Sequence, residues 1–105
     1  MIVQFKNQKC IVEIGLYDND YKAIILIDAT NGERVITATT NVAPSGAKIT
    51  DKDHVYIKDY SENTGTVVAL KEANVIEHDI TNQFYATFVT INEYKLTPKA
   101  LKLWK

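Results

Sequence analysis

One segment in the first half of the chain constrains the fold more than any other, because it has the pattern of a β-hairpin. Residues 21–28, YKAIILID, are rich in isoleucine and predict a central strand that is covered on both faces. The pair Asn31-Gly32 follows, and both residue types tolerate the positive φ that a two-residue type I′ turn requires. The threonine-rich residues 33–41 then suit a returning strand with one half-exposed face. Antiparallel β-structure is therefore expected here.

Other short apolar runs continue this pattern along the chain. Further strands are predicted at residues 2–5, 10–17, 54–58 and 83–94. The first two are separated by a polar tetrapeptide and predict a hairpin, whereas residues 42–53 contain Pro44 and Gly46 and predict a surface loop. Residues after Pro98 fit either a short edge strand or a helical turn, and the sequence does not decide between them.

Only residues 64–73 have a convincing helical periodicity. Val67, Leu70 and Ala73 fall three positions apart and define one apolar face. Asn74 is well placed as a left-handed residue just beyond the helix, with apolar surface folding back behind it. The sequence thus predicts a single domain over residues 1–105 of the α+β class, with an antiparallel sheet of about five or six strands and a single helix packed on one face.

Charge and cysteine content exclude several classes of protein. Twelve basic and 13 acidic side chains give a net charge of -1, which argues against general nucleic-acid binding and also against a strongly acidic DNA mimic. Cys10 is the only cysteine, so no internal disulfide and no thiolate metal cage are expected, and its apolar surroundings predict an inert core thiol. No apolar run approaches the roughly 20 residues that span a bilayer, and the first residues do not resemble a signal peptide. The protein is expected to be cytoplasmic, with no membrane contact.

Motifs for catalysis are not found in the sequence. It contains no serine elbow, phosphate-binding loop, dinucleotide fingerprint or zinc-protease motif, so we expect a protein that is not an enzyme and needs no cofactor. Asp51, Asp53 and His54, with Asp59 further on, suggest a metal site, but their spacing matches no structural zinc site and supplies too few oxygen ligands for calcium. A charged turn leading into a strand is the better interpretation, and a metal-dependent enzyme ranks last.

A polar cluster at the N-terminal end of the predicted helix is the candidate functional site. It consists of Asp59, Tyr60, Ser61, Glu62, Asn63, Thr64 and Gly65. Free backbone N–H groups and the helix dipole favour an anion there, although the two carboxylates would repel one. Alternatively, Ser61 or Asn63 caps the helix, and this interpretation is favoured. Tyr60 lies in a loop rather than a strand, so it is the aromatic residue that we expect to act as an exposed anchor.

From residue 35 onward the chain resembles a small family without an established activity that occurs on bacteriophages, plasmids and other mobile elements of gut bacteria. The family pattern runs Ile-Lys-Asp-Tyr/Trp-Ser-Glu-Asn-Glu-Gly and continues into a helix that ends Glu-Ala-Gly-Ile-Val. The matching residues are Ile57, Lys58, Asp59, Tyr60, Ser61, Glu62, Asn63 and Gly65 in the motif, and Ala69, Leu70, Glu72 and Ala73 in the helix. Thr64 replaces the second glutamate, and Asn74 replaces the glycine after the helix.

This resemblance implies where such a protein occurs, on phages and mobile elements, but not how it acts. We expect a non-enzymatic accessory protein of a phage or mobile element that binds a host protein in the bacterial cytoplasm and inhibits a host defence factor. The alternative is a protein that binds or sequesters a small anionic ligand, such as a nucleotide signal, in a pocket between subunits. A homodimer is left open. The basic side chains near the C-terminus, at Lys95, Lys99, Lys102 and Lys105, are most simply a solvated end of the chain.

Overall fold

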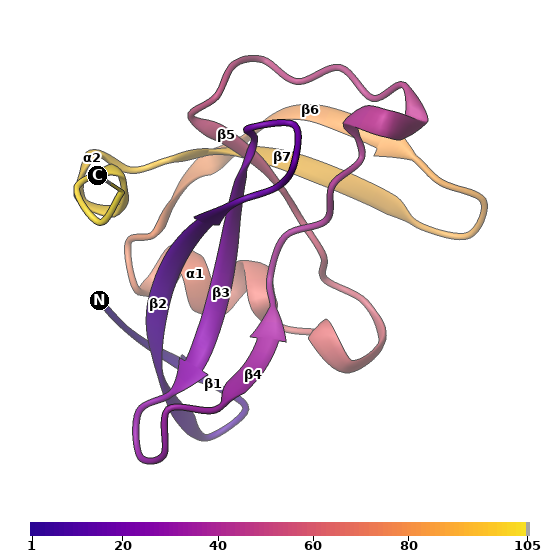
Figure 1. Ribbon diagram of the computed structural model, residues 1–105. Helices are drawn as coiled ribbons and strands as arrows, with labels where there is room; N and C mark the ends of the chain where they lie inside the picture. The colour runs from indigo at the N-terminus through magenta and orange to yellow at the C-terminus, as the bar shows by residue number, and fades with distance from the viewer. Residues whose placement is uncertain (105) are drawn as a thin grey trace.

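The computed structural model describes residues 1–104 and shows an α+β protein whose strands form two antiparallel sheets (Figure 1). The first sheet has the order β1-β2-β3-β4, with β1 at Ile2–Phe5, β2 at Gln8–Leu16, β3 at Lys22–Asp28 and β4 at Arg34–Thr37. The second has the order β5-β7-β6, with β5 at His54–Ile57, β6 at Ile76–Tyr85 and β7 at Thr90–Leu96. Helix α1 spans Thr66–Glu72, helix α2 spans Pro98–Leu101, and single 3-10 turns lie at Ala43–Ser45 and Ser61–Asn63.

The predicted α+β class and antiparallel pairing are confirmed, but the strands within residues 1–104 number seven and divide into two sheets rather than one. Residues 38–40 join the sheets at one side. The N–H of Ala38 donates to the carbonyl of Ile24 in β3, and the N–H of Lys58 donates to the carbonyl of Ala38. Thr39 forms an isolated bridge with Ile57 of β5. The returning strand that was predicted at residues 33–41 therefore pairs with one sheet along its first part and with the other along its last.

The β3–β4 hairpin is confirmed, but the predicted two-residue type I′ turn is wrong. The N–H of Asp28 donates to the carbonyl of Glu33 at 2.7 Å, so residues 29–32 form a four-residue loop. Gly32 alone takes a positive φ in this loop, at 76°. The side chain of Asp28 accepts a hydrogen bond from the N–H of Thr30 at 2.7 Å, and this bond is the largest cause that holds the pKa of Asp28 below its ordinary value. A side-chain acceptor thus stabilises a longer turn than the Asn-Gly pair alone predicts.

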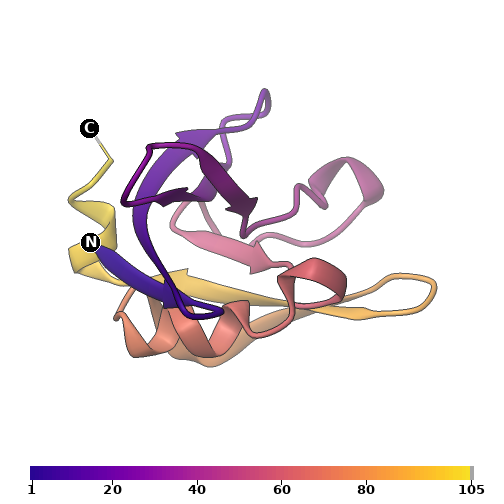
Figure 2. The same cartoon turned by 90° about the horizontal axis from the view of Figure 1, so that it is seen from below.

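The prediction of one strand at residues 83–94 is also wrong, because the chain reverses direction within it. Residues 86–89 form a turn between β6 and β7, in which the N–H of Ala86 donates to the carbonyl of Val89 at 2.9 Å. This turn contains no glycine, proline, asparagine or aspartate, so the usual signals for a turn are missing from its sequence. The β6–β7 hairpin extends well beyond the rest of the molecule (Figures 1 and 2).

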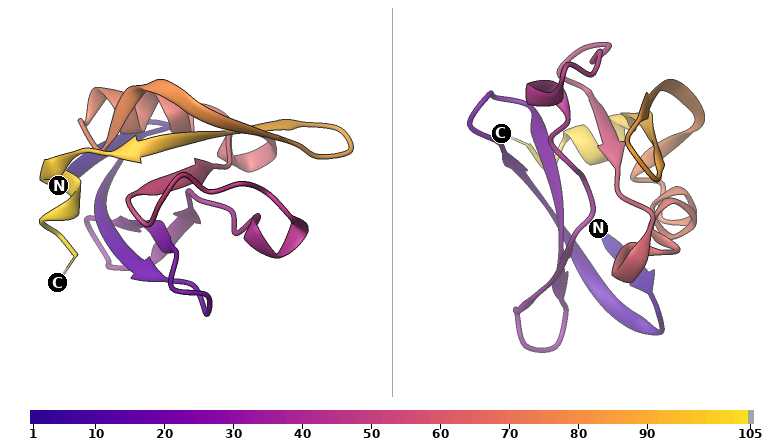
Figure 3. Two further views of the ribbon diagram at one scale, coloured as in Figure 1. Left: turned by 90° about the horizontal axis from the view of Figure 1, so that it is seen from above. Right: turned by 90° about the vertical axis from the view of Figure 1, so that its right-hand side faces the viewer.

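The main core lies between the two sheets and α1 (Figure 3). It contains fully buried residues of both sheets, among them Leu26 of β3 and Leu96 of β7. Helix α1 contacts β1 of the first sheet and β6 of the second. It buries Thr66, Ala69 and Leu70, so its buried face is rotated from the predicted Val67–Leu70–Ala73 stripe, of which only Leu70 is fully enclosed. Cys10 is buried in the same core, and burial raises the pKa of its thiol, as expected of an inert core cysteine.

A smaller apolar cluster lies on the other face of the second sheet. Tyr56 alternates with the core residues Val55 and Ile57 along β5, so its ring points to the opposite side, where it packs with Val42 and Ile91. The predicted surface loop at residues 42–53 covers this side, and the Tyr56 hydroxyl donates to the carbonyl of Lys48 at 2.6 Å.

The segment after Pro98 is a helical turn rather than an edge strand. Thr97 caps α2, with its Oγ1 accepting a hydrogen bond from the N–H of Ala100 at 3.1 Å. Lys105, the last residue of the basic C-terminal segment, lies outside the described residues. Within residues 1–104, no helix has the length and apolar character that crossing a bilayer requires.

Candidate functional site

The predicted site forms a tight loop that connects β5 to α1 and includes the 3-10 turn at Ser61–Asn63 (Figure 1). Two of its residues have left-handed backbones, Ser61 with φ 54° and Gly65 with φ 96°. A Cβ added to Gly65 would meet no atom within 4 Å, so the backbone conformation, not the available space, favours glycine there. The loop therefore has a specific shape, set by two positions of positive φ.

Side chains of the loop form hydrogen bonds with backbone groups of the same loop. The Oδ1 of Asp59 accepts a hydrogen bond from the N–H of Gly65 at 2.6 Å. The hydroxyl of Thr64 donates to the carbonyl of Ser61 at 2.8 Å, and the hydroxyl of Thr66 donates to the carbonyl of Asn63. Three side chains thus satisfy backbone groups that an irregular segment otherwise leaves to water. These hydrogen bonds fix the backbone conformation of the loop.

The prediction that Ser61 or Asn63 caps the helix is wrong. Gly65 is the N-cap of α1, and no side chain bonds the first turn from that position. Asn63 is instead buried, and its Nδ2 donates to the carbonyl of Thr37 at the end of β4, at 2.9 Å. Its role in the structure is to tie the loop to the first sheet. Local sequence could not reveal this, because the partner lies 26 positions away.

Tyr60 does not project freely into solvent. Its ring is half-buried and packs against the cluster of Val42, Tyr56 and Ile91, with the Lys58 ammonium 5.4 Å from its centroid. Part of the ring is accessible, but Tyr60 also holds the loop against the second sheet. The side chains that the loop does expose are those of Asp59, Ser61, Glu62 and Thr64.

Glu62 is an exposed charged group of the loop. Its Oε1 lies 3.5 Å from the Nζ of Lys58, and its backbone carbonyl accepts a hydrogen bond from Lys6 at 2.7 Å. A hydrogen bond from its own backbone N–H, followed by the charge of Lys58, holds the pKa of Glu62 below its ordinary value. It is therefore ionised at neutral pH. Lys6 lies in the β1–β2 turn, so the first sheet also supports the loop.

The arrangement offers little to an incoming anion. The carboxylate of Asp59 accepts a hydrogen bond from the N–H of Gly65, the N-cap of α1, so it places a negative charge where an anion would approach the helix start. Among residues 1–104, no group of three or more histidine, cysteine or acidic side chains is placed to hold a metal ion.

Asp51, Asp53 and His54 are bonded to groups of the protein itself. The Oδ1 of Asp51 lies 2.7 Å from the Nδ1 of buried His54 and also accepts a hydrogen bond from the N–H of Asp53. These two bonds, the one from His54 first, lower the pKa of Asp51. Asp53 pairs with Lys22 at 3.4 Å. The predicted charged turn before a strand is confirmed.

Sequence reasoning missed a buried carboxylate on β7. Glu93 is fully enclosed and has no basic partner among the described residues; its carboxyl oxygens are bonded by neutral hydrogen-bond donors instead. Its carboxylate accepts bonds from the N–H and hydroxyl of Thr50, the hydroxyl of Thr81 and the amide of Asn82. It thus joins the 42–53 loop to the irregular part of β6. A glutamate between Asn92 and Tyr94 carries no local signal for such a role.

Comparison of the chain with models of protein families, with curated proteins and with solved structures gave no match.

Proposed function

We propose that this chain is a non-enzymatic accessory protein of a phage or another mobile element, and that it binds a host protein, such as a defence factor, in the bacterial cytoplasm. The contact surface in this proposal is the loop at residues 59–65 with the start of α1. The resemblance of residues 57–65 to a mobile-element family supplies the setting. The binding role is supported by the construction of the loop.

The observation that carries the proposal is that this loop is fixed in advance of any contact. The side chains of Asp59 and Thr64 bond the backbone of the loop, and that of Asn63 bonds the loop to β4. A loop that is already ordered loses little conformational entropy on binding, and rigid loops on a β scaffold are common binding surfaces. Exposed Glu62 and Ser61 at its tip then supply a charge and a hydrogen-bonding hydroxyl to a partner.

The small anionic ligand is the weaker alternative, because the Asp59 carboxylate lies at the helix start, bonded to the N–H of Gly65, and Glu62 adds a second negative charge. A thermal-shift assay with a panel of cyclic nucleotides separates the two. A rise of several degrees at micromolar nucleotide would favour sequestration of a ligand. We expect no shift.

The direct test is co-purification from host lysate with a matched pair of charge reversals. Glu62→Lys removes the exposed pair with Lys58 but none of the hydrogen bonds from Asp59, Asn63, Thr64 and Thr66 that fix the loop. Glu13→Lys makes the same charge reversal at an exposed position of β2. We expect a captured host protein to be lost with Glu62→Lys and kept with Glu13→Lys. Equal capture by both variants would contradict the assignment of the contact surface.

A further inference from the structure

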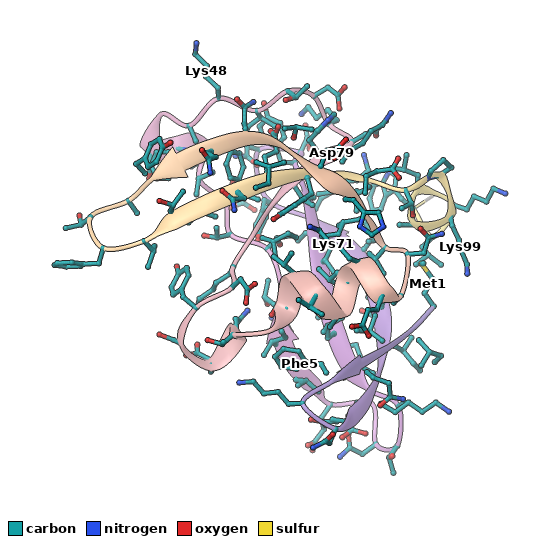
Figure 4. The ribbon with its side chains drawn as sticks, turned by 180° about the vertical axis from the view of Figure 1, so that it is seen from behind. Met1, Phe5, Lys48, Lys71, Asp79 and Lys99 are labelled. Atoms are coloured by element: carbon teal, nitrogen blue, oxygen red, sulfur yellow. The ribbon has the colours of Figure 1, made fainter. Side chains whose placement is uncertain are left out.

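The outer edge of β6 is the open edge of the second sheet. In the strand order β5-β7-β6, the opposite edge strand, β5, is bridged to the first sheet's side of the molecule through Ile57 and Thr39. Residues 77–85 of β6 are exposed or half-buried. Figure 4 shows β6, which carries the labelled Asp79, on the near side of the molecule with no other segment in front of it. The backbone of this strand is therefore accessible from outside.

The hydrogen-bond pattern of the β6–β7 hairpin shows which backbone groups of β6 face this edge. Residues 82–85 pair with β7 without interruption, and the N–H of Ala86 donates to the carbonyl of Val89. In an antiparallel pair, residues that bond their partner alternate with residues that do not. Counting back from Ala86, the residues whose N–H and carbonyl groups point away from β7 are Gln83 and Tyr85.

This part of β6 lacks the usual protection of an edge strand. Natural edges are commonly protected from pairing by charged side chains, proline or β-bulges. Residues 80–92 contain no charged side chain and no proline, and the register shifts of β6 lie before Asn82, outside the regular stretch. Among the described residues, no hydrogen bond outside the strand ladders comes from the N–H of Gln83 or Tyr85. These groups are left for a further strand.

We propose that β6 pairs with β6 of a second copy of this chain, in antiparallel orientation with Phe84 at the two-fold axis. The two three-stranded sheets then form one sheet of six strands. The loop at residues 59–65 contributes none of the new hydrogen bonds, so the inference does not depend on the proposed function.

The positions of the outward groups select this register. With the axis at Phe84, Gln83 of each copy lies opposite Tyr85 of the other, and each of these pairs exchanges two backbone hydrogen bonds. An axis at Gln83 would set Tyr85 against Thr81, which lies at a register shift. An axis at Tyr85 would set Gln83 against Thr87, which lies in the turn. Only the axis at Phe84 uses the regular stretch of both strands.

The side chains of this stretch also fit a second copy. Phe84 would face its own counterpart in a non-hydrogen-bonded pair, where side chains lie closest, and aromatic pairs across two strands are stabilising. On the other face, Tyr85 would lie beside Gln83 of the second copy. Within one chain the Tyr85 hydroxyl already donates to the Oε1 of Gln83 at 3.0 Å, so the two groups are chemically matched. The stretch has no charge, so the axis brings no like charges together.

The paired stretch is short, so the dimer should be weak. It buries less than the about 1,000 Å² expected of a stable, specific interface, which places it with weak and transient contacts. We expect a dissociation constant on the order of 100 μM, because a few backbone hydrogen bonds and one aromatic pair must outweigh the loss of free motion on association.

Sedimentation equilibrium of the full chain and of two variants at one position tests the pairing. Gln83→Pro and Gln83→Ala both remove the side chain and its bond to Asn92, but only proline also removes the outward N–H. Proline is tolerated in an edge strand where the N–H faces solvent, so the β6–β7 ladder should be kept. We expect association to weaken by about tenfold or more for Gln83→Pro, which loses one backbone bond on each side of the axis, and by less than about threefold for Gln83→Ala. A wild type that is monomeric at about 2 mM would overturn the proposal, and so would a folded Gln83→Pro variant that associates like the wild type.

Amide hydrogen exchange of the wild type gives a second test that needs no substitution. Between about 20 μM and about 2 mM protein, the amides of Gln83 and Tyr85 should come to exchange at least about threefold more slowly, because they are bonded only in the dimer. The amide of Thr87, in the turn, is the matched control and should not change. Unchanged exchange at Gln83 and Tyr85 would overturn the proposal even if Gln83→Pro fails to fold. Slowing at Thr87 alone would show a contact between hairpin tips and would overturn it as well.

Discussion

At the scale of single residues, Glu93 shows how one side chain can hold distant parts of the chain together. Its partners are Thr50 in the 42–53 loop and Thr81 and Asn82 in β6. All of them donate, so the site is built for an acceptor with two oxygens. Every buried polar side-chain atom in the described part of the chain has a hydrogen-bond partner, which means that the cost of burying this carboxylate is met by these donors.

Replacing one oxygen of Glu93 by an amide nitrogen should therefore be costly although the shape is kept. Glu93→Gln sets an NH₂ donor against at least one of these donors and leaves it without an acceptor, so we expect the free energy of unfolding to fall by about 1–3 kcal/mol. Urea unfolding at neutral pH measures this change. Glu13→Gln, on the exposed face of β2, is the matched control and should change stability by less than about 0.5 kcal/mol. Equal effects of the two changes would refute the assigned role.

At the scale of the elements, the end of α1 was predictable because its signal is local. Asn74 has φ 60°, the N–H of Val75 donates to the carbonyl of Leu70 at 2.9 Å, and the N–H of Asn74 donates to that of Lys71 at 3.0 Å. This is the Schellman arrangement, with buried Val75 folding apolar surface back onto the helix.

Two substitutions at Asn74 isolate the effect of its backbone conformation. Asn74→Gly should be neutral or slightly stabilising, because glycine adopts positive φ without strain. Asn74→Val should lower the free energy of unfolding by about 1–2 kcal/mol, because a β-branched residue is strained there. The side chain of Asn74 is exposed, so lost packing contributes little to either change. Thermal unfolding of both variants provides the check, and a glycine variant as unstable as the valine variant would rule out this explanation.

The β6–β7 turn and the helix cap were not predictable, because both depend on contacts between residues that are distant in sequence. The turn at residues 86–89 lacks turn-forming residues, and the chain reverses there because β7 pairs with β5 on one side and with β6 on the other. Asn63 is typical of a cap in sequence, yet a carbonyl of β4 takes its amide. Sequence patterns thus located β1 to β5, α1 and the loop at residues 59–65, whereas the end of β6 and β7 were merged into one predicted strand. The patterns did not show which side chains of that loop form tertiary contacts.

At the scale of the whole molecule, the two sheets depend on a shared core. Residues 38–40 join the sheets on one side, and α1 contacts β1 and β6 on the other. Leu26 of the first sheet and Leu96 of the second belong to one buried cluster. Neither sheet keeps an enclosed apolar face without the other, so the molecule should unfold in one step despite its divided β-structure.

Leucine truncations in each sheet test this dependence. Leu26→Ala and Leu96→Ala each remove a fully buried side chain, and each should lower the free energy of unfolding by about 2–5 kcal/mol. Leu16→Ala, at an exposed site, should have an effect below about 0.5 kcal/mol. Far-UV circular dichroism and tyrosine fluorescence should report the same urea midpoint for every variant, because both sheets lose their common core together. Midpoints that separate in Leu96→Ala would show that the first sheet stays folded when the second has opened, and the shared core would then not be what couples them.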